Sequence, residues 1–168
     1  MIILLTGPTG SGKTDVSWAL IEQSNAMVFL DCDWFASYTP FDWKNEHDVE
    51  GVFQALSIMI QFHLEHGRKN FVIPMTIQMA KLFKKNDTYF LSSKLPIKKF
   101  RLRCDNAELS HRIKKRDRID FQKQGELNNM EQAQSTFDQL FPKSDIFYLI
   151  DTTHLTESDV AKKILENV

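Results

Sequence analysis

Short apolar runs alternate along this chain with longer segments in which apolar residues recur every three or four positions. Short runs rich in branched aliphatic residues predict β-strands, and the longer periodic segments predict helices. Strands are predicted at residues 2–5, 26–30, 71–75, 97–104 and 146–150, and helices at 14–24, 47–66, 77–83, 108–115, 130–140 and 156–165. Strands that alternate with helices form parallel sheets through right-handed crossovers. The pattern therefore predicts an α/β fold with a five-stranded parallel sheet between helices.

Two segments depart from this pattern. Residues 116–129 are polar, contain Gly125 and show little apolar periodicity, which is typical of an irregular excursion. The run at 97–104 carries Lys99, Arg101 and Arg103 at alternate positions, although a central parallel strand is normally apolar on both faces. Either that face is incompletely covered, or its long side chains extend past apolar neighbours to solvent.

The strongest chemical signal directly follows the first predicted strand. The segment from Gly7 to Thr14 matches the phosphate-loop pattern G-x-x-x-x-G-K-[ST] in full. Its glycines permit backbone conformations that a Cβ would block, so successive N–H groups turn toward one anion, and the next helix adds its positive end. We expect Lys13 to act on the outer phosphates and Thr14 to bind Mg²⁺. The predicted nucleotide-binding residues are Gly7, Pro8, Thr9, Gly10, Ser11, Gly12, Lys13 and Thr14.

Two carboxylates, Asp31 and Asp33, follow the second predicted strand. Ligands of such sheets bind beyond the carboxyl ends of the strands. Phosphoryl transfer to a hydroxyl needs a Mg²⁺ position and a group that orients or deprotonates the nucleophile, and two carboxylates could divide these tasks. The alternative is that either aspartate caps a short helix that begins at Trp34.

An unusual density of aromatic residues follows, from Trp34 to Trp43. An aromatic wall suits a planar or ring-shaped ligand. A small satellite core beneath a loop would use the same residues, and the sequence does not separate these readings.

The phosphate loop together with Asp31-Cys32-Asp33-Trp34 resembles the small P-loop kinases of metabolites and antibiotics. That family includes shikimate kinase, gluconate kinase, chloramphenicol phosphotransferase and nucleotide-kinase-like ATP-binding proteins. The resemblance covers essentially the whole chain and implies a P-loop NTPase fold with a small lid at approximately residues 116–129. It also implies that Asp31 helps to hold Mg²⁺ and that Asp33 contacts the acceptor.

Further site residues are implied by the same resemblance. Trp34, Phe35 and Tyr38 would help to form the acceptor pocket. Lid arginines would close over ATP, and the turn after the last strand would edge the adenine. These cofactor contacts would fall on Arg112, Arg116, Arg118, Asp151 and Thr152, with Arg116 also catalytic. A solvated basic helix face and a hydrogen-bonded turn are the plainer alternatives.

Composition narrows the class of protein. The chain has 168 residues, of which 42% are hydrophobic and 26% charged, with a formal net charge of -1 and two cysteines. We expect one domain at residues 1–168, without a disulfide framework. Near-neutral charge argues against a nucleic-acid clamp, and no apolar stretch is long enough to span a membrane. We therefore expect a cytoplasmic protein, either a monomer or a homodimer.

The function hypothesis follows from these sites. We expect a phosphotransferase that moves the γ-phosphate of ATP to a hydroxyl or phosphate of a small acceptor, such as a nucleoside, nucleotide, sugar acid or antibiotic. Lys13, Asp33 and Arg116 would be its catalytic residues, with ATP and Mg²⁺ as cofactors. The alternative is a regulatory P-loop protein that binds or slowly hydrolyses ATP without such an acceptor. No acid ends strand 71–75, which argues against motor NTPases.

Overall fold

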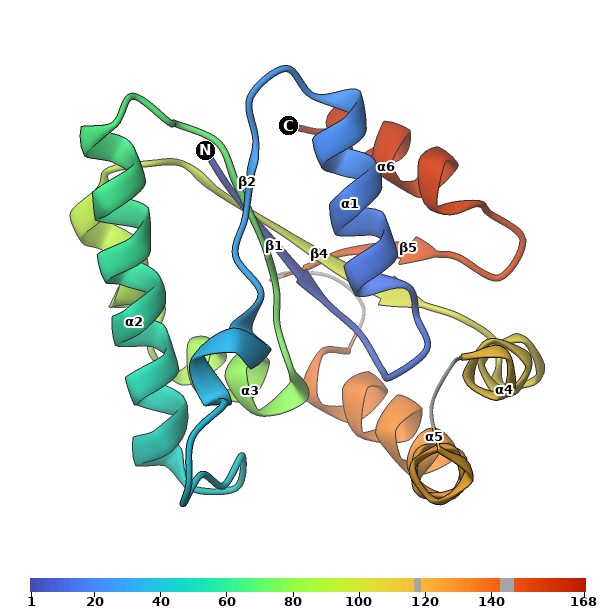
Figure 1. Cartoon of the computed structure of the whole chain (residues 1–168). Helices are drawn as coiled ribbons and strands as arrows, with labels where there is room; N and C mark the ends of the chain where they lie inside the picture. The colour runs from blue at the N-terminus through green and yellow to red at the C-terminus, as the bar shows by residue number, and fades with distance from the viewer. Residues whose placement is uncertain (117–118, 143–146) are drawn as a thin grey trace.

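A five-stranded sheet in the order β2-β3-β1-β4-β5 forms the centre of the computed structural model, and every neighbouring pair is parallel (Figure 1). The model describes residues 1–116, 119–142 and 147–168, apart from the side chains of residues 121 and 131. The strands are β1 (Ile2–Thr6), β2 (Val28–Phe29), β3 (Phe71–Pro74), β4 (Ile97–Arg103) and β5 (Tyr148–Asp151). The predicted α/β P-loop fold with five parallel strands is confirmed, although residue 146, the predicted start of the last strand, lies outside the described residues.

Helices cover both faces of the sheet. Helices α1 (Lys13–Gln23) and α6 (Glu157–Leu165) pack on one face (Figure 1). The other face is covered by α2 (Glu46–Glu65), α3 (Ile77–Lys85), the 3₁₀ helix η2 (Thr88–Ser93) and the end of α5 (Asp120–Leu140). Helix α4 (Asn106–Lys115) and the start of α5 lie beyond the carboxyl ends of the strands, near the loop between β1 and α1.

Burial explains why the central strands read as apolar runs. Every residue of β1 and β3 is buried, because helices cover both of their faces. Two apolar clusters lie on opposite sides of the sheet, one beneath α2 and α3 and the other beneath α1 and α6. None of the described helices has the length and apolarity needed to span a lipid bilayer.

The expected irregular excursion at 116–129 is wrong for residues 120–129, which form the first half of α5. The helix has a weak apolar stripe there because most of the segment is polar and none of its described side chains is buried. Local side-chain contacts replace packing: Gln124 donates to Asn128 at 2.8 Å, and Asn129 donates to the Gly125 carbonyl at 2.8 Å. A polar helix supported in this way gives no periodic signal in the sequence.

The basic face of β4 is divided among three environments. Arg101 is 4% exposed beneath α5, where it donates to the Phe141 carbonyl at 2.9 Å and pairs with Asp138. The Lys99 ammonium lies 5.2 Å from the Phe83 ring centroid, whereas Arg103 is exposed. Helix α5 and its C-cap residue therefore explain why an arginine can be buried in β4, because they supply the hydrogen-bond and charge partners of Arg101.

Candidate functional site

The loop between β1 and α1 has the backbone of an anion cradle. Gly7, Gly10 and Gly12 all have positive φ, at 149°, 87° and 92°. A Cβ at Gly7 would lie 2.4 Å from the Leu102 carbonyl oxygen, so a side chain cannot fit at this position. Helix α1 begins at Lys13 after Gly12, whose lack of a side chain leaves the first helical N–H groups without a side-chain cap. These groups and the helix dipole are available to an anion.

Lys13 folds back over this cradle. Its ammonium donates to the Gly7 carbonyl at 2.8 Å and to the Pro8 carbonyl at 3.1 Å. Burial lowers the pKa of Lys13 to about 8, against an ordinary value of 10.5. Among nearby charges, Arg116 also lowers this pKa, whereas Asp31 and Asp33 raise it. A lysine placed among these groups gains a full charge most readily when an anion enters the loop.

The other loop residues differ in exposure. Pro8 and Ser11 are buried, whereas Thr9 and Thr14 are exposed at the tip of the loop and at the start of α1. Ser11 Oγ has no hydrogen-bond partner within the described part of the chain. The predicted nucleotide-binding residues from Gly7 to Thr14 thus form one continuous structural unit.

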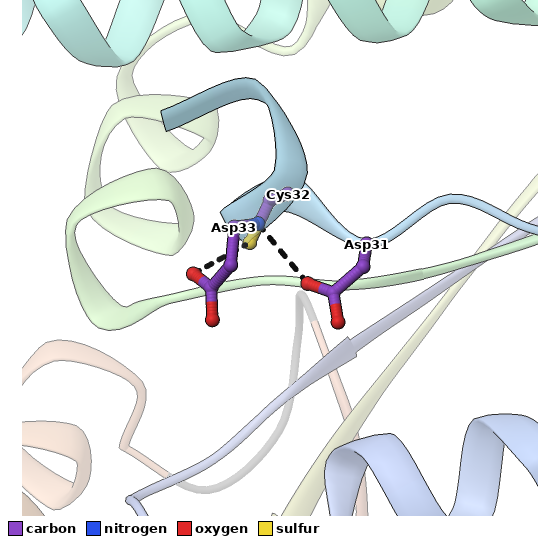
Figure 2. Close-up of side chains that lie close together, drawn as sticks. All are labelled: Asp31, Cys32 and Asp33. Carbon is purple, nitrogen blue, oxygen red and sulfur yellow. Dashed lines mark hydrogen bonds between the residues drawn. The ribbon is translucent and has the colours of Figure 1, made fainter. Parts of the chain in front are cut away.

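Asp31 and Asp33 project to the same side of the turn after β2 (Figure 2). One carboxylate oxygen of each aspartate and the Cys32 sulfur all lie within 4.8 Å of one another. Asp31 is the N-cap of the 3₁₀ helix η1 (Cys32–Ala36) and accepts from the Asp33 amide at 3.0 Å. Burial raises the pKa of Asp31, and the neighbouring Asp33 charge raises it further. Asp31 therefore caps a short helix, as the alternative interpretation expected. The Asp33 side chain is exposed.

Cys32 lies beneath these two carboxylates as a buried thiol. Its sulfur is 3.9 Å from Asp33 Oδ1, and burial raises its pKa further above the ordinary value. Such a thiol is a packing residue rather than a nucleophile, because the thiolate form is disfavoured.

Strand β3 lies between β2 and the phosphate-loop strand. It is followed by the buried Met75 and by Thr76, the N-cap of α3, and neither residue is acidic. Both aspartates nevertheless lie close enough to Lys13 to influence its pKa. The carboxylates after β2 thus lie near the lysine of the phosphate loop, and Asp31 is a residue that could supply an oxygen ligand to Mg²⁺.

The aromatic residues after Asp33 do not share one wall. Trp34 is 59% exposed and turns toward the sheet edge, where its ring lies 5.6 Å from that of Phe29. Phe35 packs against the apolar cluster beneath α2 and α3. Tyr38 is exposed, with its ring 5.2 Å from that of Phe41. The predicted acceptor-pocket role of these residues remains a prediction, and Phe35 also packs on the main core rather than on a separate satellite core.

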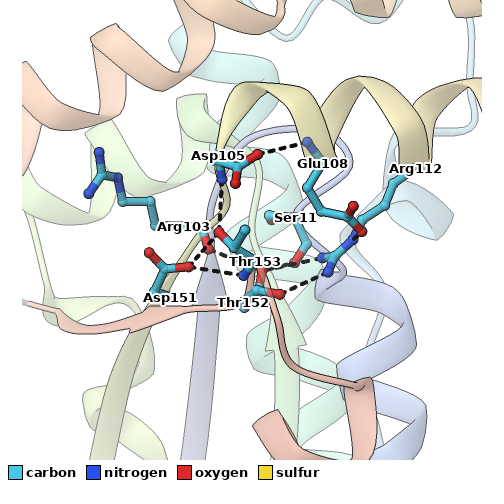
Figure 3. A network of polar contacts seen from close by, with 8 residues as sticks. All are labelled: Ser11, Arg103, Asp105, Glu108, Arg112, Asp151, Thr152 and Thr153. Atoms are coloured by element: carbon cyan, nitrogen blue, oxygen red, sulfur yellow. Dashed lines mark hydrogen bonds and ion pairs between the residues drawn. The ribbon is translucent and has the colours of Figure 1, made fainter.

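Arg112 and Thr152 are joined by hydrogen bonds within the protein (Figure 3). Arg112 pairs with Glu108 at 2.8 Å and donates to the Thr152 hydroxyl at 3.3 Å and carbonyl at 2.8 Å. Thr152 is 1% exposed. Asp151 is exposed and accepts from Thr153, whose hydrogen bonds lower the pKa of that carboxyl. Contact of these residues with a nucleotide remains a prediction.

Arg116 is the C-cap of α4, where the expected lid segment begins. It pairs with Glu126 of α5 at 3.4 Å, and it is near enough to Lys13 to lower the pKa of that lysine. Arg118 lies outside the described residues. Glu126 belongs to no sequence motif. Only its ion pair with Arg116 in the folded chain associates it with the site.

A cavity of about 490 Å³ lies beside the phosphate loop, between α4 and the turn after β5. Some residues of its lining were not predicted from the sequence, because they belong to no motif and come from segments that are far apart in the chain. The lining residues are Gly10, Gly12, Asp15, Glu108, His111, Arg112, Lys115, Arg116, Leu155, Thr156 and Glu157. A cavity of this size suits a small organic ligand whose anionic end lies on the loop.

Solved structures share the whole fold. The tunicamycin resistance protein of Deinococcus radiodurans matches with a TM-score of 0.68 at 15% identity, over 99% of this chain and 94% of that one. A sugar kinase from Janibacter sp. matches with 0.66 at 15% identity, over 98% and 92%. Shikimate kinase from Bacteroides thetaiotaomicron matches with 0.64 at 18% identity, over 99% and 97%. The resemblance to small P-loop kinases is thus confirmed for the fold.

Comparison of sequences gives a single family. No curated protein sequence matches the chain. Residues 2–140 match a family model described as an AAA domain, a segment that runs from β1 through α5 and contains the complete phosphate loop. The chain therefore belongs to the AAA domain family of P-loop proteins.

Proposed function

We propose that this protein is an ATP-dependent phosphotransferase that phosphorylates a small acceptor. The observation that carries the proposal is the convergence of Lys13, Asp31 and Asp33 at the mouth of the phosphate loop, where both carboxylates influence the pKa of the lysine. A P-loop protein that only senses a nucleotide has no need of a second, exposed carboxylate facing the transferring phosphate.

The donor half of the site fits a nucleoside triphosphate. The glycine backbone and the uncapped start of α1 would hold the phosphate chain, with the Lys13 ammonium on the outer phosphates. The cavity of about 490 Å³ beside Gly10 and Gly12 would take the nucleoside. Arg116 would offset charge on the transferring group from the lid side.

The oxygen donors of Thr14 and Asp31 fit Mg²⁺, which prefers hard oxygen ligands and retains several waters. When bound, Mg²⁺ would neutralise part of the phosphate charge. Asp31 is suited to a water-mediated role, because one of its oxygens already caps η1.

Asp33 would act on the acceptor. Its carboxylate would accept the proton of the acceptor hydroxyl while that hydroxyl oxygen forms a bond to the γ-phosphorus of ATP. The bond between the γ-phosphorus and the β,γ-bridging oxygen would break at the same time, which releases ADP. The exposed aromatic residues Trp34 and Tyr38 lie on the same turn and would border a ring-shaped acceptor such as a nucleoside, sugar acid or antibiotic.

The competing function is a regulatory protein that hydrolyses ATP slowly without an acceptor. An acceptor panel separates the two. With ATP and Mg²⁺, ADP release is measured after addition of nucleosides, nucleotides, sugars, sugar acids and antibiotics. We expect at least one acceptor to stimulate release well above slow hydrolysis, whereas release that no acceptor changes supports the regulatory protein.

Substitution of the base sharpens this test. We expect Asp33→Asn to lower acceptor-stimulated turnover by about 10²- to 10⁴-fold, with ATP affinity nearly unchanged, because the amide cannot accept the proton. Asp42→Asn is the matched control: Asp42 follows the same turn but caps the next one, accepting from the Lys44 amide. Equal losses in the two variants would remove Asp33 from the proposed role.

A further inference from the structure

Thr152 is a buried residue at the carboxyl end of β5, and its side chain faces the phosphate loop. Its backbone amide donates to the Arg103 carbonyl at 2.7 Å, which fixes the residue to β4. Its hydroxyl lies 3.0 Å from that carbonyl and 3.5 Å from the carbonyl oxygen of Ser11 in the loop. At 1% exposure, Thr152 offers almost no surface to a ligand.

Arg112 approaches the same place from α4, and all three of its donor groups are used within the protein. Nε pairs with Glu108, Nη1 donates to the Thr152 hydroxyl, and Nη2 donates to the Thr152 carbonyl (Figure 3). A Cβ built on Gly12 would lie 4.0 Å from Arg112 Nη1. The guanidinium and the Thr152 hydroxyl thus lie next to the Ser11–Gly12 peptide.

That peptide precedes the first helical residue, Lys13, and contributes the last part of the anion cradle. The backbone is unusual there, with Gly12 in the left-handed region at φ 92°. Ser11 Oγ, although buried, has no hydrogen-bond partner among the described residues. The Thr152 hydroxyl near the Ser11 carbonyl and the Arg112 guanidinium near Gly12 are contacts that reach this peptide from outside the loop.

We propose that Thr152 is a positioning residue that, together with Arg112, supports the Ser11–Gly12 part of the phosphate loop and sets the direction of its N–H groups. This inference rests on the proposed binding of a nucleotide at the loop and assigns Thr152 an indirect role. Loss of the support would weaken binding of any phosphate chain, with or without a nucleoside. A residue that contacted the nucleoside would instead matter only to the nucleotide.

Thr152→Val tests this directly, because it replaces the hydroxyl with a methyl of similar shape. Affinities for ATP and for inorganic tripolyphosphate are measured by calorimetry in the presence of Mg²⁺, without any acceptor, so that the result does not depend on phosphoryl transfer. We expect both affinities to fall together by about three- to tenfold, the effect of losing one or two hydrogen bonds. Thr152→Ser, which keeps the hydroxyl, should restore both to within about twofold.

Thr153→Val is the matched control. The Thr153 hydroxyl lies in the same turn but donates to Asp151 and accepts from the Asp105 amide, and among the described residues it makes no hydrogen bond to the phosphate loop. We expect it to leave tripolyphosphate affinity unchanged. A loss confined to ATP, or no loss in Thr152→Val, overturns the inference, as does an equal loss in Thr153→Val. If Thr152→Val does not fold, Thr152→Ala carries the same expectations and the same contrary outcomes.

Discussion

At the scale of single residues, Lys13 is the phosphate-loop residue whose pKa responds to the charged groups around the site. The lysine lies between Arg116, which opposes its charge, and the two aspartates, which favour it. Its position was predictable because the loop motif specifies it. The lowered pKa was not, because it depends on burial in the folded chain and on the charge of Arg116, which is far from the loop in the sequence.

The lowered pKa gives a signed prediction. In the free protein Lys13 loses its proton around pH 8, whereas an unfolded lysine does so near 10.5, so the folded state binds fewer protons between these values. Stability of the free protein should therefore rise with pH across that window. Bound phosphate favours the charged form, so MgATP binding near pH 9 should take up a proton.

Calorimetry in two buffers of different ionisation enthalpy measures this uptake. We expect a fraction of a proton up to one per site near pH 9, and almost none near pH 6.5. Lys13→Arg is the control, because its guanidinium stays charged at both pH values and should show no uptake. Binding near pH 9 without proton uptake in the unsubstituted protein would contradict the assigned environment of Lys13.

Gly7 and Thr152 show which properties of single residues could be predicted from the sequence and which could not. Gly7 was predictable as a loop glycine, and the structure adds the reason, a Leu102 carbonyl 2.4 Å from the position of a Cβ. Thr152 was noticed only through a resemblance, and its contact with Ser11 spans 141 positions. Long-range hydrogen bonds of this kind leave no periodic pattern in a chain.

At the scale of elements, α5 links the candidate lid to the sheet. Its first half carries Glu126, which pairs with Arg116, and its second half is anchored by two buried polar side chains. Gln134 donates to the Cys104 carbonyl at 2.8 Å, and Arg101 of β4 binds Asp138 and the Phe141 carbonyl. The apolar periodicity that predicts helices identified only residues 130–140, because the first half of α5 is mostly polar and has little apolar stripe.

The two members of the Arg101–Asp138 ion pair differ in burial: the Arg101 side chain is 5% exposed and that of Asp138 is 49% exposed. We expect Asp138→Asn to lower the free energy of unfolding by about 2 to 4 kcal/mol, because it leaves a buried guanidinium without its counter-charge. Adding Arg101→Met should restore most of the loss. Urea unfolding measures each variant.

The surface pair of Glu46 and Lys85 provides the control, since both side chains are mostly exposed. Glu46→Gln should change the free energy of unfolding by less than about 1 kcal/mol. If Asp138→Asn were as mild as Glu46→Gln, or the double variant less stable than Asp138→Asn alone, the anchoring of α5 by a buried charge would be wrong.

At the scale of the whole molecule, the parallel sheet brings distant segments to one edge. The class of fold and the number of strands followed from alternating periodicities, since buried strands and amphipathic helices differ in period. The placement of β3 between β2 and β1 could not be read in that way. It matters for the site, because it places the carboxylates after β2 one strand away from the phosphate loop, with the non-acidic residues Met75 and Thr76 at the strand end between them.

The near-zero net charge conceals two opposed local groups. Acidic side chains of the turn after β2 face the loop from one side, while Arg112 and Arg116 approach it from α4. In the proposed reaction the basic side would hold the donor, and the acidic side would act on the acceptor.

The fate of the γ-phosphoryl group tests the central proposal most directly. The protein is mixed with ATP, Mg²⁺ and the acceptor that most stimulates ADP release, and ³¹P NMR follows the products. We predict one phosphorylated acceptor for each ADP, with little inorganic phosphate. If inorganic phosphate instead matched ADP for every acceptor, the protein would hydrolyse ATP and the proposed phosphotransferase would be wrong.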